Sequence, residues 1–264
     1  MAITSGEAIT ITFGDVSENG TRMERIGKPR ENGFSVRELE EILVRLNEKT
    51  DIAEIYYLTE FIPDEVWDNL TDQVQRDCDA AILVIRNGAD LFGVNPDKLM
   101  ESLRELEWDK KKFMYGRVVN SIARSNLCFS TFSQEPDYEN KKGRIYKYND
   151  VPDLKIIWEG IGNKLGDKAK NLEGEGNYYY DVSECGIGFH GDKERIIVVA
   201  LRLGESMPIH YQWYQNSKKI GNRIDIDLHH GDIYIMSEKA VGKDSSKRII
   251  PTLRHAAGSK KYVK

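Results

Sequence analysis

Hydrophobic and polar positions alternate in short runs along the second half of the chain, and Gly and Asn turns separate the runs. This regular spacing of short strands is typical of an all-β sandwich or a jelly roll. A helical pattern at residues 153–165 interrupts it. The predicted strands lie at residues 178–180, 186–190, 196–203, 209–214, 223–228, 233–236 and 249–255.

The first 108 residues mix both periodicities. Residues 9–13 alternate like a strand, and residues 35–46 carry apolar positions at helical spacing behind Ser35 and Glu38, the pair of a capping box. Further strands are predicted at 55–58 and 81–84, and helices at 64–74 and 96–106. We therefore predict an α+β protein, in which a small α/β domain of unknown role (residues 1–108) precedes a jelly-roll domain (residues 109–264).

Composition fits a globular protein, because the 264 residues are 40% hydrophobic. Cys78, Cys128 and Cys185 form no paired-cysteine motif, which favours a reducing compartment and argues against zinc. The chain has no run of about 18 apolar residues, and its N-terminus has no signal-peptide pattern. We expect a soluble intracellular protein, in the cytoplasm or the nucleus, with no membrane partner.

Charge is uneven along the chain. The net charge is -5, so the whole molecule is not an obvious ligand for polyanions. Residues 242–264, however, contain seven Lys or Arg and the single acid Asp244. This basic segment is interpreted either as a solvated tail or as a surface that faces phosphates.

The strongest chemical signal is His190-Gly191-Asp192 at the end of a predicted strand. A histidine and a carboxylate two residues apart, completed by a distant histidine, form the facial triad of non-haem Fe(II) oxygenases. A second copy of the pattern, at 230–232, is followed too soon by His255, the last histidine of the chain. Since several strands must separate the second and third ligands, we assign His190, Asp192 and His255 to the metal and catalysis. The second copy is predicted to be a turn before the strand 233–236.

Five ordered motifs over residues 177–258 resemble the AlkB-like branch of the Fe(II)- and 2-oxoglutarate-dependent oxygenases. These motifs are Asn177-Tyr178-Tyr179, His190-Gly191-Asp192, Leu203-Gly204, His230-Gly231-Asp232 and the pair Arg248 and Arg254. The resemblance implies a double-stranded β-helix, the jelly roll of this superfamily. It also implies Fe(II) and 2-oxoglutarate as cofactors and O2 as a cosubstrate.

The resemblance further implies roles for single residues. Asn177 and Tyr179 would donate to the cosubstrate carboxylates, and Arg248 would clamp the C5 carboxylate through its bidentate guanidinium. Arg254 would lie near the iron and the cosubstrate. However, Arg254 and His255 are neighbours, so in a regular strand they point to opposite faces. Either His255 is the third ligand, with Lys260 or Lys261 serving the cosubstrate, or both arginines face inward; we favour His255.

Aromatic and charged residues near the predicted entrance of the jelly roll are candidates for substrate binding. The set Tyr178, Tyr211 and Trp213 is interpreted either as core or as a stacking wall for a flat base. Glu194 and Arg195 follow the metal carboxylate and are expected at the substrate entrance. The segment 115–117 falls where a substrate lid would precede the barrel.

The function implied is oxidative demethylation or hydroxylation of a modified base in DNA or RNA. The same barrel also serves other substrates, since fold alone does not decide function. One alternative is a hydroxylase of protein side chains, with the N-terminal residues as a docking surface. Another is a catalytically silent jelly roll that binds a ligand or a partner.

Overall fold

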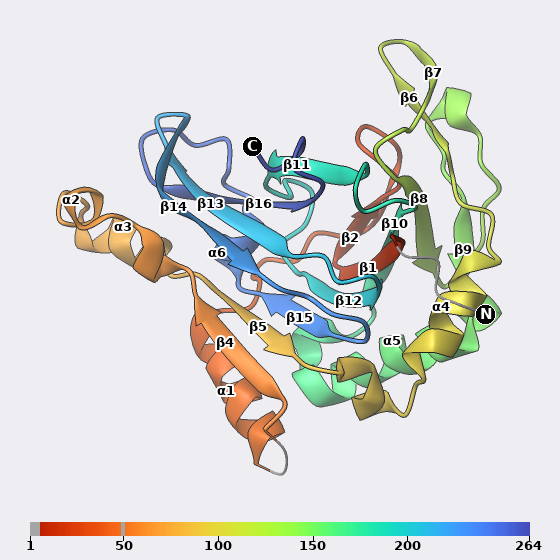
Figure 1. The fold of residues 1–264 in the computed structure, drawn as a ribbon, viewed down its shortest axis with the longest axis horizontal. Helices are drawn as coiled ribbons and strands as arrows, with labels where there is room; N and C mark the ends of the chain where they lie inside the picture. Colours follow the sequence, from red (N-terminus) through yellow and green to blue (C-terminus); the bar gives the residue numbers. More distant parts are fainter. Residues whose placement is uncertain (1–5, 49–50) are drawn as a thin grey trace.

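The computed structural model describes residues 6–48 and 51–264. It is a mixed α and β structure, in which most residues of regular structure belong to two large sheets (Figure 1). The larger sheet has eight strands, all antiparallel except the pair β8 and β9. In spatial order these strands are β4 (Ala53–Tyr57), β5 (Ala81–Ile85), β15 (Ile233–Met236), β12 (Val199–Gly204), β1 (Ala8–Gly14), β10 (Glu173–Tyr179), β8 (Ser125–Ser130) and β9 (Ile145–Lys147).

The smaller sheet has four strands, in the order β11 (Gly186–His190), β16 (Thr252–Gly258), β13 (Ile209–Gln215) and β14 (Lys218–Ile226). Two separate ribbons pair β2 (Val16–Glu18) with β3 (Arg25–Gly27) and β6 (Lys111–Met114) with β7 (Arg117–Asn120). The β6–β7 ribbon projects from the body of the molecule (Figure 1). From β10 to β13, successive strands alternate between the two sheets.

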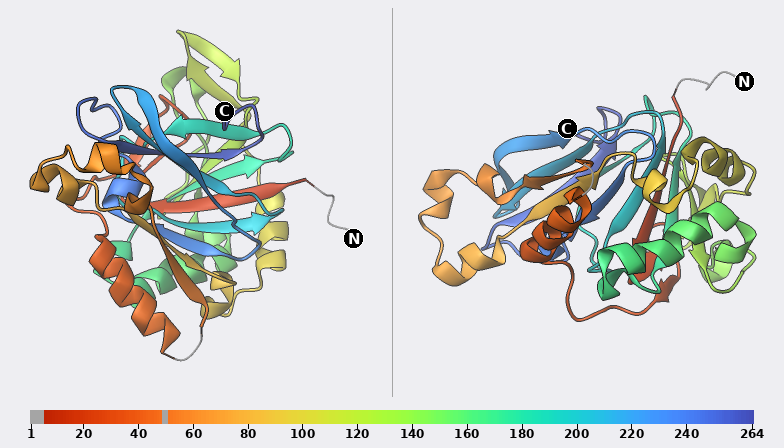
Figure 2. Two further views of the ribbon diagram at one scale, coloured as in Figure 1. Left: turned by 60° about the vertical axis from the view of Figure 1, so that its left-hand side comes forward. Right: turned by 90° about the horizontal axis from the view of Figure 1, so that it is seen from below.

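The helices are α1 (Val36–Asn47), α2 (Asp64–Trp67), α3 (Asp72–Asp77), α4 (Pro96–Arg104), α5 (Pro152–Leu165) and α6 (Glu238–Val241). Helix α1 begins with the predicted capping box of Ser35 and Glu38. Helices α1, α4 and α5 share one hydrophobic core with the large sheet, and α1 and α5 lie along the outside of that sheet (Figures 1 and 2). None of the helices in the described ranges is long and apolar enough to cross a membrane.

Strand alternation gives the large sheet two chemically different faces. In β1, Ile9, Ile11 and Phe13 belong to the core shared with the helices. The side chains between them, Thr10 and Thr12, face the opposite side, toward the small sheet, and line a cavity. The sequence of β1 therefore builds a helix-covered core and a polar cavity wall at once.

Several predicted elements are confirmed. The strands at 186–190 and 233–236 have the predicted bounds, and His230-Gly231-Asp232 is the turn that opens β15. The predicted helix at 64–74 is two helices, because Thr71 caps a new helix at α3. The strand predicted at 249–255 begins only at Thr252, and Ile249 is exposed. Strand β8, with no alternating pattern in its sequence, was not predicted.

The boundary predicted at residue 108 does not separate two sheets or two cores. Strand β1 lies between β10 and β12, and β5 pairs with β15. The largest hydrophobic cluster likewise runs from Ile9 to Ile235. Residues from both sides of the predicted boundary therefore complete one sheet.

Candidate metal centre

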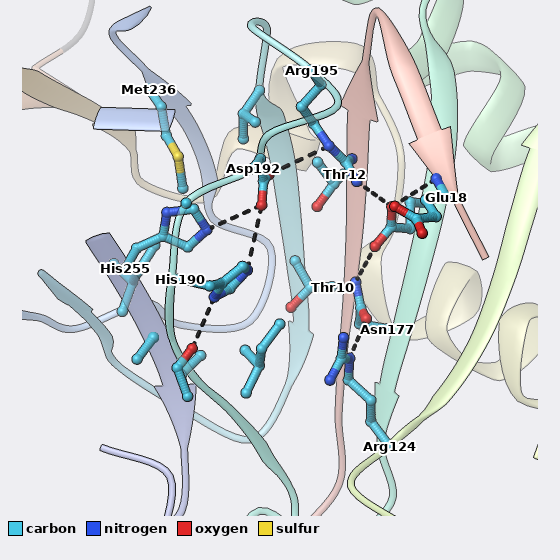
Figure 3. A pocket seen from close by; sticks show the side chains of 18 of the residues that line it. Thr10, Thr12, Glu18, Arg124, Asn177, His190, Asp192, Arg195, Met236 and His255 are labelled. Carbon is cyan, nitrogen blue, oxygen red and sulfur yellow. Dashed lines mark hydrogen bonds and ion pairs between the residues drawn. The ribbon is translucent and has the colours of Figure 1, made fainter. Parts of the chain in front are cut away.

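His190, Asp192 and His255 converge at the end of β11 (Figure 3). Strands β11 and β16 pair so that His190 lies opposite His255, and the two rings are 4.4 Å apart. The Asp192 Oδ1 atom lies 3.3 Å from His190 Nε2 and 3.6 Å from His255 Nε2. Ligand atoms that share one metal at about 2.1 Å lie about 3 Å apart, so this spacing suits a single ion.

Close backbone packing holds the carboxylate in place. The amide of Asp192 donates to the Val241 carbonyl at 2.9 Å, which docks the loop after β11 on the end of α6. A Cβ atom at Gly191 would lie only 2.0 Å from the Gly242 carbonyl oxygen. Glycine between the two ligands is therefore required by the approach of two backbones.

Electrostatics favour the ligand forms of Asp192 and His255. Burial alone would raise the pKa of Asp192, but Arg195 and the two histidines hold it well below its usual range. Burial and the neighbouring His190 lower the pKa of His255 to about 4, so this imidazole is neutral at neutral pH. The His190 Nδ1 atom lies 2.8 Å from the Gly188 carbonyl, and this bond leaves Nε2 free as a ligand atom.

The donor set fits a divalent transition metal. Two imidazoles and one carboxylate on one side of an ion would leave its other positions open, as in non-haem iron oxygenases. All three side chains line a cavity of about 320 Å³ between the two sheets. Asn177 and Tyr179, the predicted cosubstrate donors, both line this cavity.

A buried charge network surrounds the triad (Figure 3). Arg195, only 3% exposed, bonds Glu175 and places its Nε atom 3.3 Å from Asp192 Oδ2. It also pairs with Glu194 at 3.1 Å. Arg195 therefore orients the Asp192 carboxylate. Both Glu194 and Arg195 line the cavity, as expected for residues near the substrate, although Arg195 is almost completely buried.

The two arginines of the family pattern lie outside the cavity lining. Arg254 points away from His255, and its guanidinium lies over the Tyr214 ring at 4.1 Å. Arg248 is exposed in the loop before β16. This geometry does not support the predicted clamp by Arg248, which lies in the exposed loop before β16, nor a place for Arg254 near the iron and the cosubstrate, because Arg254 and the inward-facing His255 are neighbours in one strand. Lys261 is also outside, paired with Glu184 at 2.8 Å.

The aromatic residues do not form the predicted stacking wall. Tyr211 and Trp213 are completely buried in a second core, where the Trp213 indole donates to the Leu58 carbonyl at 2.8 Å. Tyr178 lies on the opposite face of β10 from the cavity, against Trp108. Of the two interpretations, core packing is the one that the structure supports for Tyr211 and Trp213.

Several polar residues of the cavity were missed in the sequence, among them Arg124, Thr10 and Arg202. Arg124 donates to Asn177 Oδ1 at 2.5 Å, whereas Thr10 and Arg202 face the cavity from β1 and β12. The available signal was the single charge of Arg202 within the apolar run 196–203. A cation at an inward position of a buried strand indicates either a buried partner or a ligand.

Comparison with known proteins identifies one clear relative. The chain is 47% identical over 258 residues to "Uncharacterized protein R156" of Acanthamoeba polyphaga mimivirus, and the match covers 98% of each chain. The chain belongs to the family of this viral protein. No family model matches the chain.

Proposed function

We propose that this member of the viral family is an Fe(II)- and 2-oxoglutarate-dependent oxygenase of the AlkB-like type. The observation that carries the proposal is the triad of His190, Asp192 and His255 in the wall of a cavity between the two sheets. The alternation of successive strands between two facing sheets supports a double-stranded β-helix as the frame. Such a barrel would present its metal between the sheets.

Different residues would have different roles in this reaction. The triad would hold the metal, Arg195 orients Asp192, and residues of both sheets line the cavity around them. Fe(II) held there would bind 2-oxoglutarate and O2, and O2 would be the oxidant: one oxygen atom hydroxylates a substrate C–H bond and the other enters succinate as 2-oxoglutarate loses CO2. Hydroxylation of an N-methyl group releases formaldehyde, which is a demethylation.

A modified base in DNA or RNA is the substrate class that we propose. Support comes from the β6–β7 ribbon, which carries exposed cations and an exposed tyrosine at its tip. Its exposed members are Lys110, Lys111, Arg117 and Tyr115, the last 81% exposed. The ribbon packs on the segment before β3 through a bond from the Phe113 amide to Met23, and Thr21 of that segment lines the cavity. Such a ribbon of exposed cations with an exposed tyrosine could bind the phosphates and stack on the bases of a single-stranded nucleic acid.

The test measures metal binding and turnover in parallel. Anaerobic addition of Fe(II) and then 2-oxoglutarate should produce the weak visible charge-transfer band of such ternary complexes. His190→Ala and His255→Ala should each lose the band and weaken metal binding at least 100-fold, by an order-of-magnitude expectation for one lost ligand. The matched control is His210→Ala, because His210 pairs with Asp225 at 2.6 Å outside the triad.

Turnover then separates the candidate substrates. With O2 present, methylated oligonucleotides should stimulate succinate formation and release formaldehyde. Stimulation by protein substrates alone would favour the side-chain hydroxylase. A parent protein that binds neither Fe(II) nor 2-oxoglutarate would refute the oxygenase and leave the silent jelly roll.

A further inference from the structure

Arg202 presents a guanidinium without a partner inside the cavity. Its side chain is 1% exposed, and its Nε and Nη1 atoms find no hydrogen-bond partner within residues 6–48 and 51–264. The nearby carboxylate of Asp232 is bonded by Arg86 at 2.6 Å. Arginine keeps its charge in proteins, so the cation is buried without a bonded counter-ion.

The position of Arg202 follows from strand parity. Its neighbours Leu201 and Leu203 face the helix-covered core, so Arg202 faces the small sheet and lines the cavity. Thr10 of β1 is its direct register partner, and the Thr10 hydroxyl is also buried without a partner. Two unpaired donors from adjacent strands therefore meet on the same cavity wall.

The other arginines of this cavity each have a side-chain partner. Arg195 is bonded to Glu175 and Glu194, although its Nη1 atom is unpaired, and Arg124 gives its Nε to Asn177. Arg248 and Arg254 are outside the lining. Among the described residues, Arg202 is thus the cavity arginine whose side chain makes no hydrogen bond or ion pair.

We infer that Arg202 and Thr10 form a carboxylate-binding site that anchors the far end of a small dicarboxylate whose other end meets the metal triad. The inference rests on the proposed function and deepens it, because the dicarboxylate is the 2-oxo acid cosubstrate. Its distal carboxylate would accept hydrogen bonds from the Arg202 guanidinium. A guanidinium and a hydroxyl offer the donors that a carboxylate accepts. The carboxylate-binding site would thus combine Thr10 of β1 with Arg202 of β12.

The test compares two ligands on two proteins by anaerobic calorimetry with Mn(II) in the site. 2-Oxoglutarate carries the distal carboxylate, and 2-oxobutyrate lacks it. The parent should bind 2-oxoglutarate at least tenfold more tightly, an order of magnitude typical of charge-assisted hydrogen bonds. Arg202→Met should lose this preference, and Thr10→Val should reduce it. Arg254→Met, outside the cavity, is the matched control and should keep it.

Separate readouts keep the outcomes distinguishable. Mn(II) binding should be unchanged in Arg202→Met, and its melting temperature without ligand should not fall, because methionine replaces an unpaired buried charge. A metal-loaded parent without preference for 2-oxoglutarate, or an Arg202→Met protein that keeps the preference, overturns the inference alone. A parent that fails to bind metal at the triad overturns the proposed function.

Discussion

Arg195 is the residue that joins the candidate metal ligands to the surrounding charges. It contacts Asp192 on one side and Glu175 on the other, and it is almost completely buried. The Glu18 amide donates to the same Glu175 carboxylate at 3.1 Å. The orientation of one ligand thus depends on residues far apart in the sequence.

Replacing Arg195 with Met should weaken both metal binding and the fold. We expect a metal affinity that is lower by roughly 10- to 100-fold, because the carboxylate loses the partner that orients it. Unfolding should become easier by about 3–5 kcal/mol, since Glu175 and Glu194 would remain buried without their cation. Metal titration and denaturant unfolding of the same sample check both numbers.

Arg195→Lys is the companion variant for this experiment. It keeps the charge but not the planar fork that reaches several carboxylates. We expect it to recover much of the stability and less of the metal affinity. Equal recovery of both would show that charge alone, without orientation, sustains the site.

At the scale of elements, the contact between the loop after β11 and the end of α6 decides whether the triad can assemble. Gly191→Ala should displace this loop, because the added Cβ meets the Gly242 carbonyl of a fixed backbone. We expect metal affinity to fall at least tenfold, as a first-order estimate for a misplaced ligand. Metal titration gives the result, and Gly93→Ala is the control. Gly93 has a positive φ and open space, so alanine there should cost about 1–2 kcal/mol without affecting metal binding.

The β6–β7 ribbon is the element that should bind the nucleic acid. Burial and the nearby Arg124 lower the pKa of Lys112, which indicates crowded positive charge at the base of the ribbon. Lys111→Glu with Arg117→Glu should reduce oligonucleotide affinity and the slope of affinity against salt, because fewer counter-ions are released. Metal binding should not change. A salt titration checks this, and an equal loss with the control Lys98→Glu on α4 would contradict a local effect.

At the scale of the whole molecule, the large sheet needs strands from both ends of the chain. Residues 109–264 expressed alone would lack β1 between β10 and β12, and β5 beside β15. The fragment would expose the apolar faces of three strands and the edges of their ladders. We expect no cooperative thermal transition by circular dichroism. A cooperative fragment that binds metal would support the two-domain division predicted from the pattern.

Helices and strands were predictable where residues close together in the sequence are enough to form them. Ser35 and Glu38 cap α1 through contacts three residues apart, and short strand-like runs bounded by turn residues predict β11 and β15 with the observed bounds. Strand β8 was not predictable in this way. All six of its residues are buried, and its sequence does not alternate, so pairing with β10 and β9 makes it a strand.

The sequence by itself determined the first two candidate ligands and the core faces of the strands. A spacing of two residues keeps His190, the last residue of β11, and Asp192, in the loop that follows, close together. Tertiary structure decided the rest, because alternation says that Arg254 and His255 diverge but not which of them faces inward. The pairing of β16 with β11 brought His255 to His190, and the placement of β1 beside β12 brought Thr10 to Arg202. Such contacts join residues distant along the chain, so no local pattern contains them.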